Sequence, residues 1–81
     1  MPIAYVKIFL RAGVTPMRRP FMIRVIGRSN AFIRGYEVND EGDEISRGKA
    51  TRILHVIHVD AIRKIKTLSM SRKYGGLMEG P

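Results

Sequence analysis

Hydrophobic and polar residues alternate over several short stretches of this chain, a pattern that predicts β-strands. The alternation is clearest in FMIRVIGR, residues 21–28, where Phe21 and Ile23 begin an apolar series on one face. Arg24 and Arg28 fall on the opposite face, together with two further apolar residues. Because neighbouring residues of a strand point to opposite faces, this segment is expected to bury one face and to expose a partly basic one.

Two more strands are expected in the first half of the chain. Residues 3–10, IAYVKIFL, are rich in β-branched and aromatic types and alternate with period two, except that Phe9 is apolar on the face of Lys7. Residues 31–39, AFIRGYEVN, predict the next strand. Its Gly35 is expected to mark a bend or a bulge, since an internal glycine weakens a strand and allows sharp curvature.

The stretch ILHVIHVDAIRKIKTL, residues 53–68, fits no single period. A helix would gather several apolar residues on one face, but other Val and Ile residues would then point elsewhere. The density of Ile and Val favours strands, because branching at Cβ suits a pleated sheet. The simplest interpretation is a strand over 52–59 and another over 64–70. Residues 60–63 would form a helical turn between them, with Asp60 capping its first N–H groups.

The remaining segments are expected to connect these strands. Residues 12–20 contain one Gly and two Pro and predict a loop. Residues 40–44, DEGDE, predict a polar turn, and residues 46–51 continue it as a basic connection. Residues 71–81 contain three Gly and one Pro, so they predict a mobile tail after a single domain over 1–70.

Five short strands and one helical turn predict an all-β domain closed or half-closed into a small barrel, because closure removes exposed strand edges. Two stretches resemble the Sm-like and SH3-like barrel families. FIRGYEVNDEGDEI is similar to the bent Sm strand that carries a Gly and ends in an acidic turn, and HVIHVDAIRKI is similar to the strand, turn and strand that close such barrels. The resemblance covers about residues 21–68 and implies a five-stranded barrel. It carries over no binding residues, because the chain has no Sm nucleotide-binding signature.

Composition adds a strong basic charge to this picture. The 81 residues include 15 Lys and Arg and 7 Asp and Glu, a net charge of +8. Five of the acids lie within 37–44, which leaves fifteen cations against two anions elsewhere, a balance of +13. Such a surface attracts polyanions, and nucleic acid is the commonest polyanion in a cell. The chain has no Cys, so it forms no disulfide and no thiolate metal site.

The basic residues are the candidate binding site. Arg donates forked hydrogen bonds to phosphate, and a tyrosine can stack on a base. The alternative interpretation is a solvated surface in which charged tips extend from apolar stems. The candidates are Arg18 and Arg19 on the first loop, Arg24 and Arg34 on two strands, Arg47, Lys49 and Arg52 before the fourth strand, and Arg63, Lys64, Lys66, Arg72, Lys73 and Tyr74 towards the C-terminus.

Other kinds of chemistry find little support in the sequence. His55 and His58 could share a metal on a helix, but on a strand they point to opposite faces, and no third His or Cys completes a site. The serines lie outside any nucleophile elbow, and no phosphate loop or calcium loop has the required spacing. The sequence therefore predicts no metal, no cofactor, no small-molecule substrate and no catalytic activity.

Two classes of function remain open. The first is non-catalytic binding of RNA or DNA through a basic face, dominated by phosphate contacts. The second is a protein-interaction module, such as a small inhibitor of viral or mobile-element type that binds an acidic site on a larger host protein. A small ribosomal or nucleoprotein subunit would share the basic bias.

The sequence also indicates the assembly and location of the chain. A domain this small is marginally stable alone, and its acidic segment could meet a basic patch on a second copy, so a homo-oligomer is expected. The apolar N-terminus lacks a basic start, and no apolar run approaches the roughly 20 residues that cross a bilayer. A cytoplasmic location without membrane contact is the expectation.

Overall fold

The computed structural model describes residues 4–13, 19–47 and 51–79 and shows an all-β fold. In this part of the chain, six strands form one antiparallel sheet in the order β6-β3-β2-β1-β7-β8, and two short strands pair separately. The strands are β1 (Ala4–Leu10), β2 (Phe21–Arg28), β3 (Phe32–Val38), β4 (Ser46–Arg47), β5 (Thr51–Arg52), β6 (Leu54–His58), β7 (Ile62–Ser71) and β8 (Gly76–Glu79), and one 3-10 turn, η1 (Val59–Ala61), joins β6 to β7.

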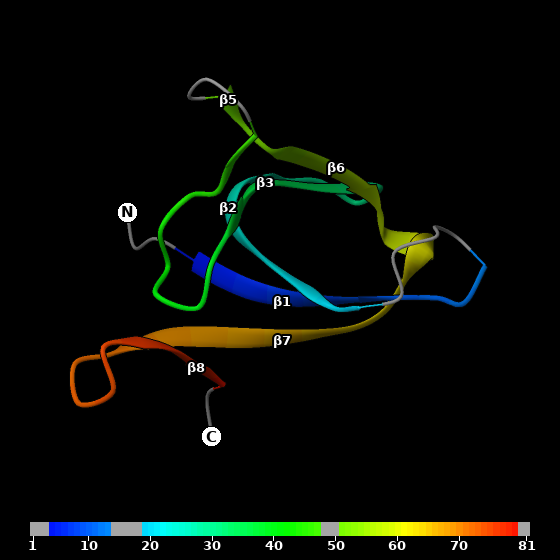
Figure 1. Ribbon diagram of the computed structural model, residues 1–81. Coiled ribbons are helices and arrows are strands. Elements are labelled where there is room, and N and C mark those ends of the chain that lie inside the picture. Colours follow the sequence, from blue (N-terminus) through cyan, green and yellow to red (C-terminus); the bar gives the residue numbers. More distant parts are fainter. Residues whose placement is uncertain (1–3, 14–18, 48–50, 80–81) are drawn as a thin grey trace.

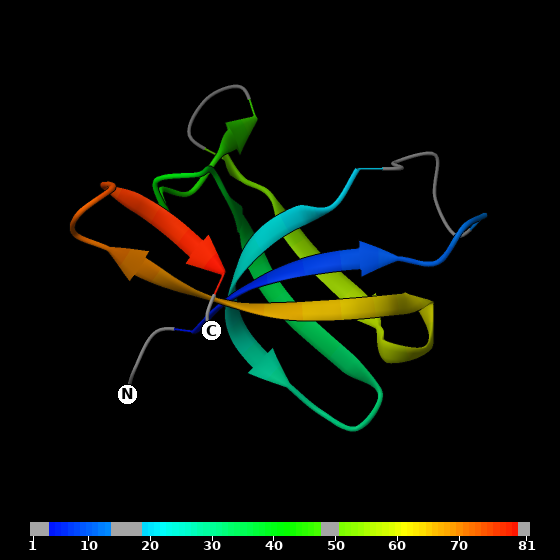
Figure 2. The ribbon, with the colours of Figure 1, turned by 90° about the horizontal axis from the view of Figure 1, so that it is seen from below.

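The sheet is curled, and its two edges remain open. Figure 1 shows β3 and β6 on one level and β1 and β7 on the other, with β2 passing between the levels. Figure 2 shows the same curl from below, with β8 lying along the far end of β7. The turn η1 closes one end through two backbone hydrogen bonds. Arg11 N donates to Ala61 O at 2.9 Å, and Val59 N donates to Ala31 O at 2.8 Å.

The predicted closure into a five-stranded barrel is wrong. In a closed barrel β6 would pair with the far side of the sheet, but in the described sheet β6 pairs only with β3. β7 pairs with β1 and, over Leu68–Ser71 alone, with β8, and no strand pairing joins β6 to β7 or to β8, so the sheet stays open. The sequence predicted residues 71–81 as a tail, but β7 extends to Ser71 and the chain then turns back along it. The additional strand β8, Gly76–Glu79, lies within that predicted tail.

The first three strands lie where the sequence predicts them, and the second half of the chain is divided differently. The predicted strand 52–59 is split between β5 and β6, and the predicted basic connection before it contributes the β4–β5 pair. The turn covers Val59–Ala61, and Asp60 is not its cap. Instead, His58 Nδ1 accepts a hydrogen bond from Asp60 N at 3.1 Å, because this imidazole stands just before the turn.

The main core lies inside the curl, where both levels of the sheet contribute side chains. Ile8 and Ile23 are completely buried, and Ile33 is 1% exposed. The cluster comprises Val6, Ile8, Phe21, Ile23, Ile33, Ile57 and Ile62. Since these residues alternate with less buried ones along β1, β2 and β3, burial of one face by apolar contact explains why the period-two pattern becomes a sheet.

The acidic turn after β3 packs against the C-terminal strand. Asn39 Oδ1 accepts hydrogen bonds from Glu41 N at 3.0 Å and from Asp43 N at 2.9 Å, which fixes the turn. Leu77 N then donates to Asp40 O at 2.7 Å, which joins the turn to β8. This contact helps to hold β8 in the sheet, so the polar turn and the predicted tail stabilise each other.

Gly35 allows β2 and β3 to approach closely. A Cβ on Gly35 would lie 2.5 Å from the carbonyl oxygen of Arg24. The pairing of β2 with β3 shifts register between Val25 and Gly27, so the irregularity expected at Gly35 lies on the facing strand.

No described helix is long and apolar enough to cross a membrane.

Candidate nucleic-acid interface

Four cations surround one aromatic ring on the outer face of β1 and β7. The charged groups lie 5.7 to 6.0 Å from the centroid of the Phe9 ring. We call this group the Phe9 cluster; it consists of Phe9, Lys7, Arg63, Lys64 and Lys66. It combines the two features that bind nucleic acid without sequence preference, namely cations for phosphates and a ring for a base.

The strand register explains how the Phe9 cluster forms. Ile8 is buried in the core, so its neighbours Lys7 and Phe9 must point outward. On β7, Lys64 pairs directly with Phe9, and the register then shifts so that Leu10 pairs with Ile62. The bulge leaves Arg63 as an extra residue of β7, which is why two consecutive cations both reach the same ring.

Glu79 compensates part of this positive charge. Lys7 and Lys66 are paired residues on adjacent strands, an arrangement of like charges that destabilises a sheet. The Glu79 carboxylate from β8 lies 2.9 Å from Lys66 Nζ and 3.9 Å from Lys7 Nζ. The hydrogen bond from Lys66 lowers the pKa of the Glu79 carboxyl below its ordinary value, although partial desolvation opposes the shift.

The Phe9 cluster keeps an excess of positive charge. Its four cations and the single carboxylate of Glu79 leave a balance of +3. Arg63 and Lys64 are exposed, and neither has an acidic partner within residues 4–13, 19–47 and 51–79. These two side chains are therefore the ones available to a polyanion.

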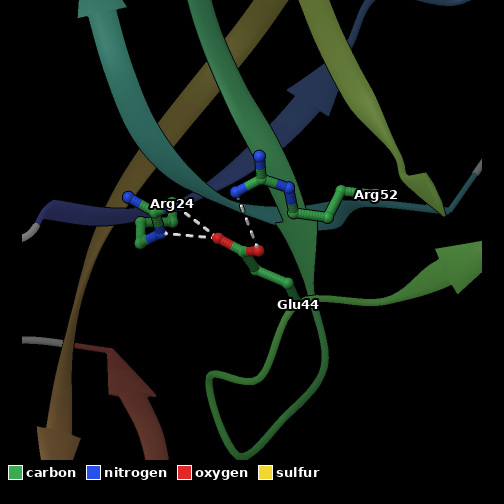
Figure 3. A network of polar contacts seen from close by, with 3 residues as sticks. All are labelled: Arg24, Glu44 and Arg52. Carbon is green, nitrogen blue, oxygen red and sulfur yellow. Dashed lines mark hydrogen bonds and ion pairs between the residues drawn. The ribbon is translucent and has the colours of Figure 1, made fainter. Parts of the chain in front are cut away.

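A second basic group, Arg24 and Arg52, shares one carboxylate within the protein. Arg24 Nε donates to Glu44 Oε1 at 3.0 Å, and its Nη2 donates to the same oxygen. Arg52 Nη1 lies 3.4 Å from Glu44 Oε2, and its guanidinium stacks 4.1 Å from the centroid of the Tyr36 ring. Figure 3 shows the carboxylate between the two guanidinium groups. Both Arg residues thus hold the acidic turn against β2 and β3.

We expect Glu44→Gln to weaken the acid sensitivity of folding. The hydrogen bond from Arg24 lowers the pKa of the Glu44 carboxyl, so the pair stabilises the fold above the ordinary value of 4.5. That stability is lost as the pH falls through the lowered pKa of the folded state. Melting temperatures measured from pH 6 down to about pH 3 should therefore fall less for Glu44→Gln than for the unchanged chain. Glu41→Gln, which changes an exposed carboxylate of the same turn, should follow the unchanged chain; equal slopes for all three proteins would contradict the expectation.

The other predicted binding residues are dispersed. Arg19 is exposed before β2, and Arg34 is exposed on β3. Arg72, Lys73 and Tyr74 lie in the turn between β7 and β8. Arg72 is eight residues from Lys64, or roughly 26 Å along an extended strand, so the two do not form the single cluster that their proximity in sequence suggested. Arg47 belongs to β4, and Arg18 and Lys49 lie outside the described residues.

The two histidines point to opposite faces of β6, as the strand interpretation predicts. His55 Nε2 lies 2.7 Å from Glu37 Oε1, and the imidazole stacks on the buried Phe21 at a centroid distance of 4.4 Å. His58 instead packs on the exposed Phe32. Among the described residues, no group of three or more His, Cys, Asp or Glu side chains is placed to hold a metal ion.

The binding residues predicted from the sequence did not include two members of the Phe9 cluster, Lys7 and Phe9. The signal was present, because Phe9 is an apolar aromatic residue that follows Lys7 on the same face of its strand. An aromatic residue that breaks the alternation beside cations is a sign of a binding surface as much as of a packing exception.

Comparisons of the chain with protein-family models, with curated proteins and with solved structures find no match.

Proposed function

We propose that this protein binds nucleic acid without catalysing a reaction, and that the Phe9 cluster is the contact surface. The supporting observation is the arrangement of four cations around one ring with a single carboxylate beside them. Phosphates bind to the ammonium and guanidinium groups, which supply most of the affinity and little sequence specificity. Phe9 adds a surface on which an unpaired base can stack.

The salt dependence of binding tests this proposal. If three phosphates are neutralised, the logarithm of the association constant for a single strand should fall with a slope of about −2 against the logarithm of the salt concentration. We expect the affinity for a fluorescent single-stranded oligonucleotide to fall roughly 20-fold between 50 and 200 mM salt. Fluorescence anisotropy with single-stranded and duplex probes measures both quantities. If neither probe binds at 50 mM salt, the proposed function is wrong.

The order of elements supports the resemblance to small Sm-like and SH3-like domains as part of this proposal. The stretch HVIHVDAIRKI forms β6, η1 and the start of β7, a strand, short turn and strand. After the turn, β7 returns to pair with β1. The proposed resemblance is one of element order alone, because the sheet is open where those domains form a barrel.

A protein-interaction module is the second candidate, and the edge strand β6 favours it. Leu54 is 50% exposed and Val56 is 55% exposed on this strand. The outer edge of β6 has no partner in the described sheet, so a segment of another protein or of a second copy can extend the sheet there. Failure of both nucleic-acid probes to bind would favour this candidate, with an acidic partner as the complement to the net charge of +8.

A further inference from the structure

A shallow pocket lies on strands other than those that carry the Phe9 cluster. Its volume is about 220 Å³, and it is lined by Arg28, Ser29, Phe32, Arg34 and Val56. These residues come from the end of β2, the following turn, β3 and β6. Pockets for drug-sized molecules have volumes of roughly 300–1,000 Å³, so this one suits a single planar ring unit.

The floor of the pocket is apolar and held in position. Phe32 is 43% exposed, and Val56 beside it is 55% exposed. The His58 ring meets Phe32 edge-on, with centroids 5.0 Å apart and an interplanar angle of 81°. His58 is itself fixed by the hydrogen bond that it accepts from Asp60 N. Phe32 is therefore an oriented aromatic surface that stays open to a ligand.

Two guanidinium groups flank this floor. Within the described part of the chain, neither Arg28 nor Arg34 forms an ion pair with a carboxylate, unlike Arg24 on the same sheet. The Arg34 side chain lies across Gly27, since a Cβ there would be 2.6 Å from Arg34 Nη2. The absence of a side chain at Gly27 thus makes room for the Arg34 guanidinium beside the pocket.

We propose that the pocket binds one base of a single-stranded nucleic acid. The base stacks on Phe32 and Val56, and the adjoining phosphates bind to Arg28 and Arg34 through forked hydrogen bonds. A nucleotide carries a flat ring and an anion in one unit, which matches a floor of one ring between two guanidinium groups. An acidic peptide must supply these groups from separate side chains. The inference rests on the proposed function and narrows its ligand to single strands, because both faces of a base in a duplex are covered by its neighbours.

Two variants test the pocket against a fluorescent twelve-nucleotide oligothymidylate and a duplex of the same length. Phe32→Leu keeps an apolar residue and removes the ring. We expect it to weaken binding of the single strand about fivefold, the lower end of base–aromatic stacking, and to leave duplex affinity unchanged. Gly27→Ala keeps every charge but displaces the Arg34 guanidinium, so it should also weaken binding of the single strand alone. Circular dichroism melting confirms that both variants are folded.

The outcomes separate this inference from the proposed function. If both variants bind the single strand as the unchanged chain does, the pocket proposal is overturned, while binding that depends on salt and on the Phe9 cluster would still stand. If the unchanged chain binds neither probe, both proposals fail. Tight binding of an acidic, tryptophan-containing peptide that Phe32→Leu abolishes would assign the pocket to a protein partner. Nuclear magnetic resonance titrations of the Val56 methyl groups compare thymidine monophosphate with the oligonucleotide. If the mononucleotide shifts these signals at concentrations as low as the oligonucleotide does, the pocket binds a free nucleotide. Either this result or the peptide result overturns the proposal that the pocket binds a single strand.

Discussion

Replacing Gly35 by Ala is expected to lower the free energy of unfolding by about 3 kcal/mol. The new Cβ would lie 2.5 Å from the Arg24 carbonyl oxygen and 3.0 Å from its carbon, and both are backbone atoms. β2 cannot move away easily, since it is hydrogen-bonded to β1 on its other side. A chain of this size has about 4–12 kcal/mol of stability in total. Thermal unfolding should therefore occur about 15 °C lower in the variant.

Gly27→Ala is the matched control for this substitution. Gly27 lies on β2 near the same bulge, but a Cβ there would meet only the flexible end of the Arg34 side chain. The side chain can swing aside, and an added methyl group also restricts the unfolded chain, so the melting temperature should change little. Equal melting temperatures for the two variants would show that β2 and β3 are not in close contact at Gly35.

The strands that bury one face could be predicted from the sequence, because a strand with one buried face has an apolar residue at every second position. This holds for β1, β2 and β3, in which Ile8, Ile23 and Ile33 are buried and their neighbours are not. The alternation also predicted that His55 and His58 point apart. These predictions need only local sequence, since each strand carries its own pattern.

Closure of the sheet could not be predicted in this way. It depends on whether the two end strands of the sheet, β6 and β8, meet, and β8 is the stretch GLME within a segment rich in glycine. Glycine is unfavourable in strands, so local composition indicated a tail. What holds β8 is pairing with β7 and the hydrogen bond from Leu77 N to Asp40 O, a contact across 37 residues that no local pattern reports.

The candidate site shows the same division between local and long-range information. The sequence identified Arg24, Arg52, Arg63 and Lys64 as cations, but it could not say which of them are available. Arg24 is paired with Glu44 from 20 residues away, whereas neither Arg63 nor Lys64 forms an ion pair with a carboxylate within the described ranges. Pairing in the folded state therefore distinguishes the cations of the proposed contact surface from the other basic residues of the chain.

Neutralising Arg63 and Lys64 together is expected to weaken binding of a single strand on the order of 25-fold at 0.1 M salt. Each lost phosphate contact removes the release of about 0.7 counterion, so the salt slope should become shallower by about 1.4. Both side chains are exposed, so Arg63→Gln with Lys64→Gln should leave the melting temperature nearly unchanged. Anisotropy titrations of the single-stranded and duplex probes at several salt concentrations measure the affinity and the slope.

The matched control removes the same charge from the other end of β7. Arg72→Gln with Lys73→Gln also takes two cations from exposed positions of the chain, in the turn before β8. General attraction by a basic protein depends mainly on total charge, so it would make the two double variants equally weak. If phosphates contact the Phe9 cluster directly, the salt dependence of binding should become shallower only in the variant at Arg63 and Lys64. If both double variants lose affinity and salt dependence equally, binding depends on net charge and the Phe9 cluster is not the contact surface.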